Sequence, residues 1–165
     1  MTFEILPSAL ASQDRAGSAY QRKCQGRATM STRNFAMIFG IVFLIVGIAG
    51  FVSPALLHPH DYPDVTVNAF EGDLLGLFPV NVLHSLVHVL FGIWGLVASR
   101  GLGASVAYAR GVAIIYAVLT VMGFVPPLDV TFGLIPLFGN DIWLHALLAI
   151  VAAYFGWVHR NPTTI

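Results

Sequence analysis

Four long runs of apolar residues dominate the chain, and polar segments separate them. The runs cover about residues 35–52, 80–99, 107–125 and 142–158. Each approaches the roughly 20 residues that an α-helix needs to cross about 30 Å of hydrocarbon. No run alternates apolar and polar residues with the period of two that a membrane β-strand shows. The pattern predicts an all-α integral membrane protein with a four-helix bundle.

The segments outside these runs predict a simple domain organisation. Residues 1–33 are polar and show no sustained period, as is typical of a disordered tail. Residues 34–160 would form the transmembrane domain, and residues 161–165 a short second tail. The turn expected at 100–104 is short, which favours antiparallel neighbouring helices. Translation could start at Met1 or at Met30.

Composition supports a lipid environment. Apolar residues make up 57% of the chain and charged residues only 10%, whereas soluble domains carry about 25% charged residues. The formal net charge of +0 gives no reason to expect a nucleic-acid partner. The single cysteine, Cys24, excludes a disulfide framework and a cysteine-rich metal site.

The positive charges predict an orientation. All eight lysine and arginine residues fall on one side of the expected helices. They are Arg15, Arg22, Lys23, Arg27 and Arg33 before the first helix, Arg100 and Arg110 around the 100–104 turn, and Arg160 after the last helix. By the positive-inside rule, both termini are expected in the cytoplasm.

The chain also contains an apparent internal repeat. Residues 50–54 read Gly-Phe-Val-Ser-Pro and residues 123–127 read Gly-Phe-Val-Pro-Pro. Residues 76–79 read Gly-Leu-Phe-Pro and residues 133–136 read Gly-Leu-Ile-Pro. These matches occur in the same order in each half. They predict two tandem helical hairpins related by an axis along the membrane normal.

Histidines at matching positions of the two halves form the main candidate site. His84 and His145 would each lie about one turn inside the outer surface, and His88 one turn deeper. The full candidate cluster is Asn81, His84, Ser85, His88, Asn140, Asp141 and His145. Small residues continue the same helix faces inward: Gly92, Gly95, Ala149, Ala152 and Gly156. Because small residues let helices approach closely, the two faces are expected to pack against each other.

Three functions remain open for these histidines. They could form an interhelical hydrogen-bond cluster that packs the bundle. They could bind a ligand: a transition metal held by His84, His88, His145 and Asp141, a haem between two histidines, or a chlorophyll magnesium on one. They could instead relay protons or ions in a small transporter, since histidine titrates near neutral pH.

The sequence gives no positive support for an enzyme. It contains no nucleophile–base pair, no phosphate-binding loop and no paired carboxylates within the expected membrane segments. The expected function is therefore that of a non-catalytic membrane protein. Apolar outer-loop segments at 74–78 and 131–138 would cap the bundle or form a docking surface. A docking surface would mean that the protein is a small subunit of a larger membrane complex or forms a homo-oligomer.

The histidine pattern also resembles a known family. The run from Asn81 through His84 to His88, and the later Leu144–His145, are similar to the small bacterial membrane proteins of domain-of-unknown-function family 4383. The resemblance covers about residues 34–157 and not the tail before Met30. It implies a four-helix protein in a bacterial cytoplasmic or intracytoplasmic membrane. It implies no activity, because none is established for that group.

Overall fold

The computed structural model describes residues 30–52, 57–59 and 61–161 of the chain. The chain divides into two units, Met1–Met30 and Ser31–Ile165. The predicted disorder of the N-terminal tail concerns residues 1–29, which lie outside the described part, as do Cys24 and residues 162–165. The fold described below is that of the second unit.

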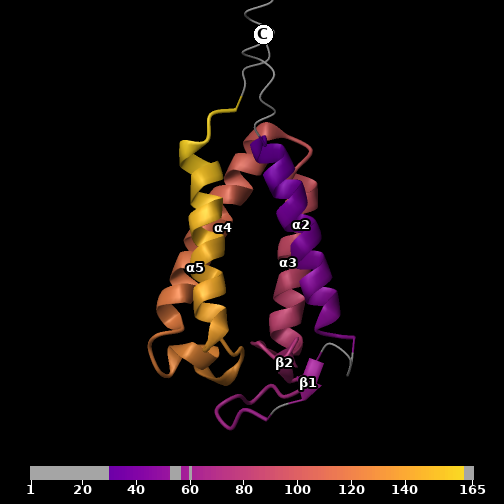
Figure 1. The fold of residues 1–165 in the computed structure, drawn as a ribbon, viewed down its shortest axis with the longest axis vertical. Helices are drawn as coiled ribbons and strands as arrows, with labels where there is room; N and C mark the ends of the chain where they lie inside the picture. Colours follow the sequence, from indigo (N-terminus) through magenta and orange to yellow (C-terminus); the bar gives the residue numbers. More distant parts are fainter. Residues whose placement is uncertain (1–29, 53–56, 60, 162–165) are drawn as a thin grey trace, which may run out of the picture. The chain divides into compact units, whose positions relative to one another are not determined.

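Four apolar helices build this unit: α2 (Thr32–Ala49), α3 (Val82–Ala98), α4 (Leu102–Met122) and α5 (Asn140–Ala153) (Figure 1). A π-helical turn, Tyr154–Val158, continues α5. The segments Thr32–Ala49, Leu102–Met122 and Asn140–Val158 are long and apolar enough to cross a membrane, while α3 is shorter at 17 residues. The mostly helical, membrane-type architecture predicted from the sequence is therefore confirmed.

Helix ends differ from the expected bounds for local reasons. The Ser31 hydroxyl accepts a hydrogen bond from the Asn34 N–H, so α2 starts at Thr32, within the segment expected to be a tail. The first helix ends at Ala49, before the expected residue 52. The turn between α3 and α4 covers only residues 99–101, because α4 already starts at Leu102. The expected turn at 100–104 is therefore too long.

The helices pack as two pairs, α2 with α3 and α4 with α5 (Figure 1). Glycines bring the first pair into backbone contact. A Cβ added to Gly92 would lie 2.9 Å from the Gly40 carbonyl oxygen, and one added to Gly95 would lie 2.8 Å from the Gly40 Cα. Such close approach is what small residues allow in membranes.

The small residues of α3 and α5 do not face each other, so that expectation is wrong. Gly92 and Gly95 face α2. A Cβ added to Gly156 would meet the backbone and side chain of Arg110 on α4, at 3.2 and 3.0 Å. Each set of small residues thus tightens its own helix pair. The reason is that the helices pack most closely within each pair, α2 on α3 and α4 on α5, so the faces with small residues are used there.

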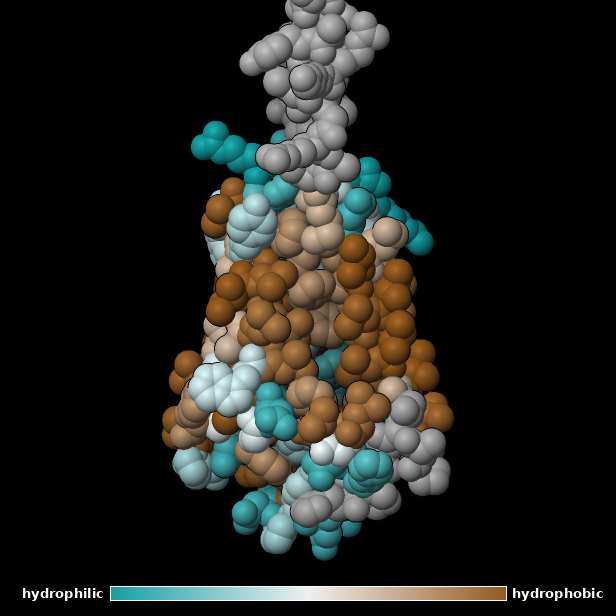
Figure 2. Space-filling view, in the orientation of Figure 1, coloured by the Kyte–Doolittle hydropathy of each residue, from teal (hydrophilic) through white to brown (hydrophobic). Residues whose placement is uncertain are grey.

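Aromatic rings join the two pairs. Phe43 of α2 stacks on Tyr116 of α4 with ring centroids 5.5 Å apart. Phe91 of α3 meets the same tyrosine edge-on at 5.6 Å. Large apolar residues also cover the outside of the helices, as Figure 2 shows in brown. Side chains such as Ile45 and Ile150, exposed by 62% and 68%, suit contact with lipid.

The loops before α3 contain a small sheet that an all-α prediction missed. Strands β1 (Leu57–Pro59), β2 (Gly72–Leu74) and β3 (Phe78–Val80) form an antiparallel sheet in the order β1-β2-β3. Gly72 pairs with Val80 and Leu74 with Phe78. Strands of three residues are too short for a period of two to be visible in sequence. Before α5, a 3-10 helix spans Leu128–Gly133.

Candidate functional site

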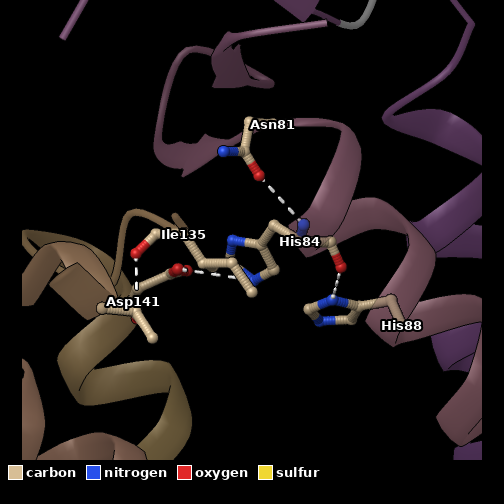
Figure 3. Close-up of polar contacts among 6 residues, drawn as sticks. Asn81, His84, His88, Ile135 and Asp141 are labelled. Carbon is tan, nitrogen blue, oxygen red and sulfur yellow. Dashed lines mark hydrogen bonds and ion pairs between the residues drawn. The ribbon is translucent and has the colours of Figure 1, made fainter. Parts of the chain in front are cut away.

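Asn81 fixes the start of α3 and the loops around it. Its Oδ1 accepts the N–H of His84 at 3.0 Å, which caps the helix (Figure 3). Its Nδ2 donates to the carbonyl oxygens of Val67 and Leu134, at 2.9 and 2.7 Å. The side chain is fully buried. Asn81 therefore holds His84 in register with the loop that leads into α5.

His84, Asp141 and His145 come together between α3 and α5. Each offers a ligand atom, and these atoms all lie within 4.8 Å of one another. The Nε2 of His84 lies 3.7 Å from Asp141 Oδ2 (Figure 3). The imidazole rings of His84 and His145 have centroids 6.2 Å apart. The facing of the two histidines expected from their matching depths is present in the structure.

Polar atoms in this group lack hydrogen bonds. Asp141 Oδ2 and His145 Nδ1 are buried and have no hydrogen-bond partner among the described residues. Asp141 and His145 are each only 2% exposed. Buried polar atoms are nearly always hydrogen-bonded in native proteins, because an unpaired one costs free energy. The group is thus chemically incomplete, and a ligand is one way to complete it.

His88 stands next to this group but is not part of it. Its Nδ1 lies 3.0 Å from the backbone carbonyl oxygen of His84, one turn earlier (Figure 3). Since a carbonyl oxygen can only accept, Nδ1 is the donor. The His88 ring also packs edge-on against Phe43, with centroids 5.6 Å apart. The sequence placed His88 among the metal ligands, whereas the structure gives it a different environment.

Ser85 and Asn140 lie outside the cluster, contrary to expectation. Ser85 turns toward α2, where a Cβ on Gly50 would overlap its hydroxyl oxygen. Asn140 is exposed and its Nδ2 donates to the Leu77 carbonyl oxygen at 3.1 Å. It connects the start of α5 to the β2–β3 turn. Ser85 follows His84 and Asn140 precedes Asp141, and both point away because successive helical residues do not share a face.

A cavity of about 170 Å³ adjoins the histidines between α3, α4 and the segment that leads into α5. Its walls include His84, His88, Phe91, Ile115, Tyr116 and His145. Sequence reasoning missed Tyr116, whose ring meets His145 edge-on at 4.9 Å. A tyrosine in the middle of an apolar run was the available signal.

At the end of the helices that carries the sheet, the loop after β1 is hydrogen-bonded to the residues of and before β2. The Tyr62 hydroxyl donates to Asp73 Oδ1 at 2.6 Å, and the Tyr62 N–H donates to Glu71 Oε1 at 3.2 Å. Burial and the Asp73 carboxylate raise the pKa of Tyr62 well above its ordinary value. The phenol therefore stays protonated, and it can keep donating to Asp73 at alkaline pH.

Comparison with known families identifies the chain's relatives. The family described as a domain of unknown function, DUF4383, matches residues 33–158. Since this is most of the chain, the protein belongs to that family, as the histidine pattern suggested. No curated protein and no solved structure matches the chain.

Proposed function

We propose that this member of the DUF4383 family is a metal-binding membrane protein, in which His84, Asp141 and His145 hold a divalent transition metal ion. Zinc is the leading candidate, because histidine and carboxylate are among its usual ligands. The observation that carries the proposal is the cluster of three ligand atoms within 4.8 Å of one another, all on buried residues.

The spacing of two ligands suits a metal better than a direct contact. The 3.7 Å between His84 Nε2 and Asp141 Oδ2 exceeds the usual length of a hydrogen bond. Ligands about 2.0–2.2 Å from a tetrahedral zinc are about 3.4 Å apart. A shift of a few tenths of an ångström would therefore bring both atoms into coordination.

The site would link the two helix pairs. His84 belongs to α3 and the other two ligands belong to α5, so the ion would bridge the hairpins near their outer ends. The corresponding positions of His84 and His145, each near the start of its helix, support the tandem repeat predicted from the sequence. Three protein ligands leave a fourth position for water or a small molecule. We assign the ion the role of joining α3 to α5.

The cavity volume argues against a tetrapyrrole. Pockets that hold drug-sized molecules measure about 300–1,000 Å³, and the cavity beside the histidines measures about 170 Å³. A haem or chlorophyll ring is too large for it. The metal ion is therefore the ligand that fits among those the histidines could bind.

A second candidate function is packing alone. A protonated His84 would form an ion pair with Asp141, which joins α3 to α5 without a metal. A proton relay has less support, because the cavity continues from the histidines along Val87, Phe91 and Leu119, which carry no polar side chain. Both alternatives predict a folded protein that binds no stoichiometric metal.

Metal analysis of the full chain tests the proposal. The protein would be purified with an affinity tag that contains no histidine, and its metal content measured by mass spectrometry. We expect about one zinc per chain, lost in Asp141→Asn and in His145→Ala. His159→Ala is the matched control and should keep the metal, because His159 lies beyond the opposite end of α5.

A cobalt spectrum supplies a second readout that needs no variant. Cobalt(II) added to the metal-free protein should give the intense visible bands of a tetrahedral site, which zinc then abolishes. A folded wild-type protein that binds neither metal, or variants that keep their zinc, would overturn the proposal and favour packing.

A further inference from the structure

The cavity between α3, α4 and the segment that leads into α5 has the size and lining of a small-molecule site. Its volume of about 170 Å³ is close to that of an engineered apolar cavity, about 150 Å³, that binds benzene. Apolar side chains form most of its wall, including Phe91, Ile115 and Leu119. An apolar cavity of this kind does not hold water well. A single-ring molecule matches its volume.

A ring nitrogen of His88, in this mostly apolar wall, can accept a hydrogen bond. The Nδ1 of His88 donates to the His84 carbonyl oxygen, so in the neutral ring the lone pair is on Nε2. His88 is only 7% exposed, and its ring uses Nδ1 for the hydrogen bond to the backbone, which leaves Nε2 for an occupant. An occupant with one hydroxyl group would satisfy this acceptor.

The aromatic rings in the wall of the cavity favour an aromatic ligand. Phe91 and Tyr116 meet at 5.6 Å, nearly perpendicular, and both line the cavity. The rings of Tyr116 and His145 are also nearly perpendicular, at 4.9 Å. Aromatic rings prefer such edge-to-face arrangements, which a further ring in the cavity could extend.

The lipid phase provides the entry route. Ile115, which lines the cavity, is 39% exposed on the outer face of α4. Val87 and Leu119 line it too and are partly buried. Because these residues lie in the apolar band of the helices, a molecule dissolved in hydrocarbon can reach the cavity by moving their side chains.

We propose that this cavity binds a membrane-soluble phenol, with the ring against Phe91 and Tyr116 and the hydroxyl donating to His88 Nε2. The proposal goes beyond the metal site. His84 and His145 line the cavity as well, but His88, which would accept the hydroxyl, is not one of the three clustered ligands. Asp141, in turn, is a proposed metal ligand that does not line the cavity.

Fluorine NMR on the full chain in nanodiscs tests this binding, with empty nanodiscs as the background for partitioning. The probes are 4-fluorophenol and fluorobenzene. We expect saturable binding of 4-fluorophenol, about five- to tenfold tighter than that of fluorobenzene because of one hydrogen bond. In His88→Leu this preference should disappear, while fluorobenzene still binds. His159→Leu is the matched control and should leave both affinities unchanged.

Two further variants make the result decisive. Ile115→Trp, which changes a partly lipid-facing side chain, should fill the cavity and abolish the binding of both probes. Asp141→Asn should lose metal and keep the phenol preference, so the two proposals fail separately. An absence of saturable binding, or an unchanged preference for phenol in His88→Leu, would overturn the proposal.

Discussion

The side-chain amide of Asn81 donates to the backbone carbonyl oxygen of Leu134 at 2.7 Å and so joins the start of α3 to the loop before α5. The same Nδ2 donates to the Val67 carbonyl oxygen, and Oδ1 caps the helix by accepting the N–H of His84. One buried residue thus satisfies the backbone of three segments that meet at the proposed metal site.

Replacing Asn81 should therefore destabilise the fold. Asn81→Ala removes the cap and leaves buried carbonyl oxygens unpaired, so we expect a loss of about 2–4 kcal/mol in the free energy of unfolding. Denaturation in detergent, followed by circular dichroism, measures it. Asn140→Ala removes a single exposed bond and should cost less than about 1 kcal/mol. Equal effects of the two substitutions would contradict the role of Asn81.

The glycine contact between α2 and α3 gives a second prediction. In Gly92→Ala, the new Cβ would lie 2.8 Å from the Leu44 N and 2.9 Å from the Gly40 carbonyl oxygen, both backbone atoms. The helices must separate, and we expect a loss of about 1–3 kcal/mol. Gly103→Ala meets no atom within 4 Å and should be neutral or slightly stabilising. Thermal unfolding in detergent compares them, and a harmless Gly92→Ala would show that the pair is loosely packed.

Tyr62 predicts a pH dependence of stability. Its pKa in the folded protein is raised above the ordinary value near 10, so its contribution is complete below pH 10 and is lost as the pH rises further. Tyr62→Phe should cost about 1–2 kcal/mol at pH 8, through loss of the bond to Asp73. The difference between wild type and variant should shrink above pH 10. Chemical denaturation at several pH values checks this, and a constant difference would refute it.

Arg110 of α4 contacts the π-helical turn after α5. This turn leaves the Gly156 carbonyl oxygen free to accept from Arg110 Nε at 2.9 Å, while the guanidinium lies 5.6 Å from the centre of the Trp157 ring. Arg110→Ala should therefore accelerate hydrogen exchange at residues 154–158, and Arg110→Lys should restore little of the protection. Arg160→Ala is the control. Exchange unchanged by Arg110→Ala would show that the turn is stable by itself.

The orientation in the membrane is also testable. Arg33, Arg100 and Arg160 lie at one end of the helices, so this end should face the cytoplasm. In a Cys24→Ser background, Leu75→Cys in the exposed β2–β3 turn should react with a membrane-impermeant maleimide on intact cells. Asn161→Cys should react only after the membrane is permeabilised. The reverse pattern would place the arginine-rich end outside.

Sequence reasoning located the helices because lipid exposure imposes a strong pattern. Long apolar runs are required to cross hydrocarbon, so the four helices could be recognised, with errors of a few residues at their ends. The capping by Ser31 was not foreseen, since it depends on a single hydroxyl. The three-residue strands were invisible because their length hides any period.

The site was only partly predictable. Matching depth in two similar halves correctly brought His84 and His145 together, because depth follows from helical rise alone. Whether a neighbour faces the cluster depends on helix rotation and loop path, which the sequence does not specify. Ser85 faces α2 and Asn140 the β2–β3 turn. Their adjacency to His84 and Asp141 in the sequence already argued against a shared helix face. Tyr116 contacts His145 because α4 packs against α5, and no local sequence pattern encodes that packing.

The shortness of α3 has a consequence for the surrounding lipid. Its 17 residues span about 25 Å, less than the 30 Å of a typical hydrocarbon layer. Such hydrophobic mismatch is relieved when the bilayer thins locally, at a cost that grows with acyl-chain length. His84 lies in the first turn of this helix, so the depth of the histidines is coupled to membrane thickness. Lipids with short chains should relieve the strain at α3 and match this protein best.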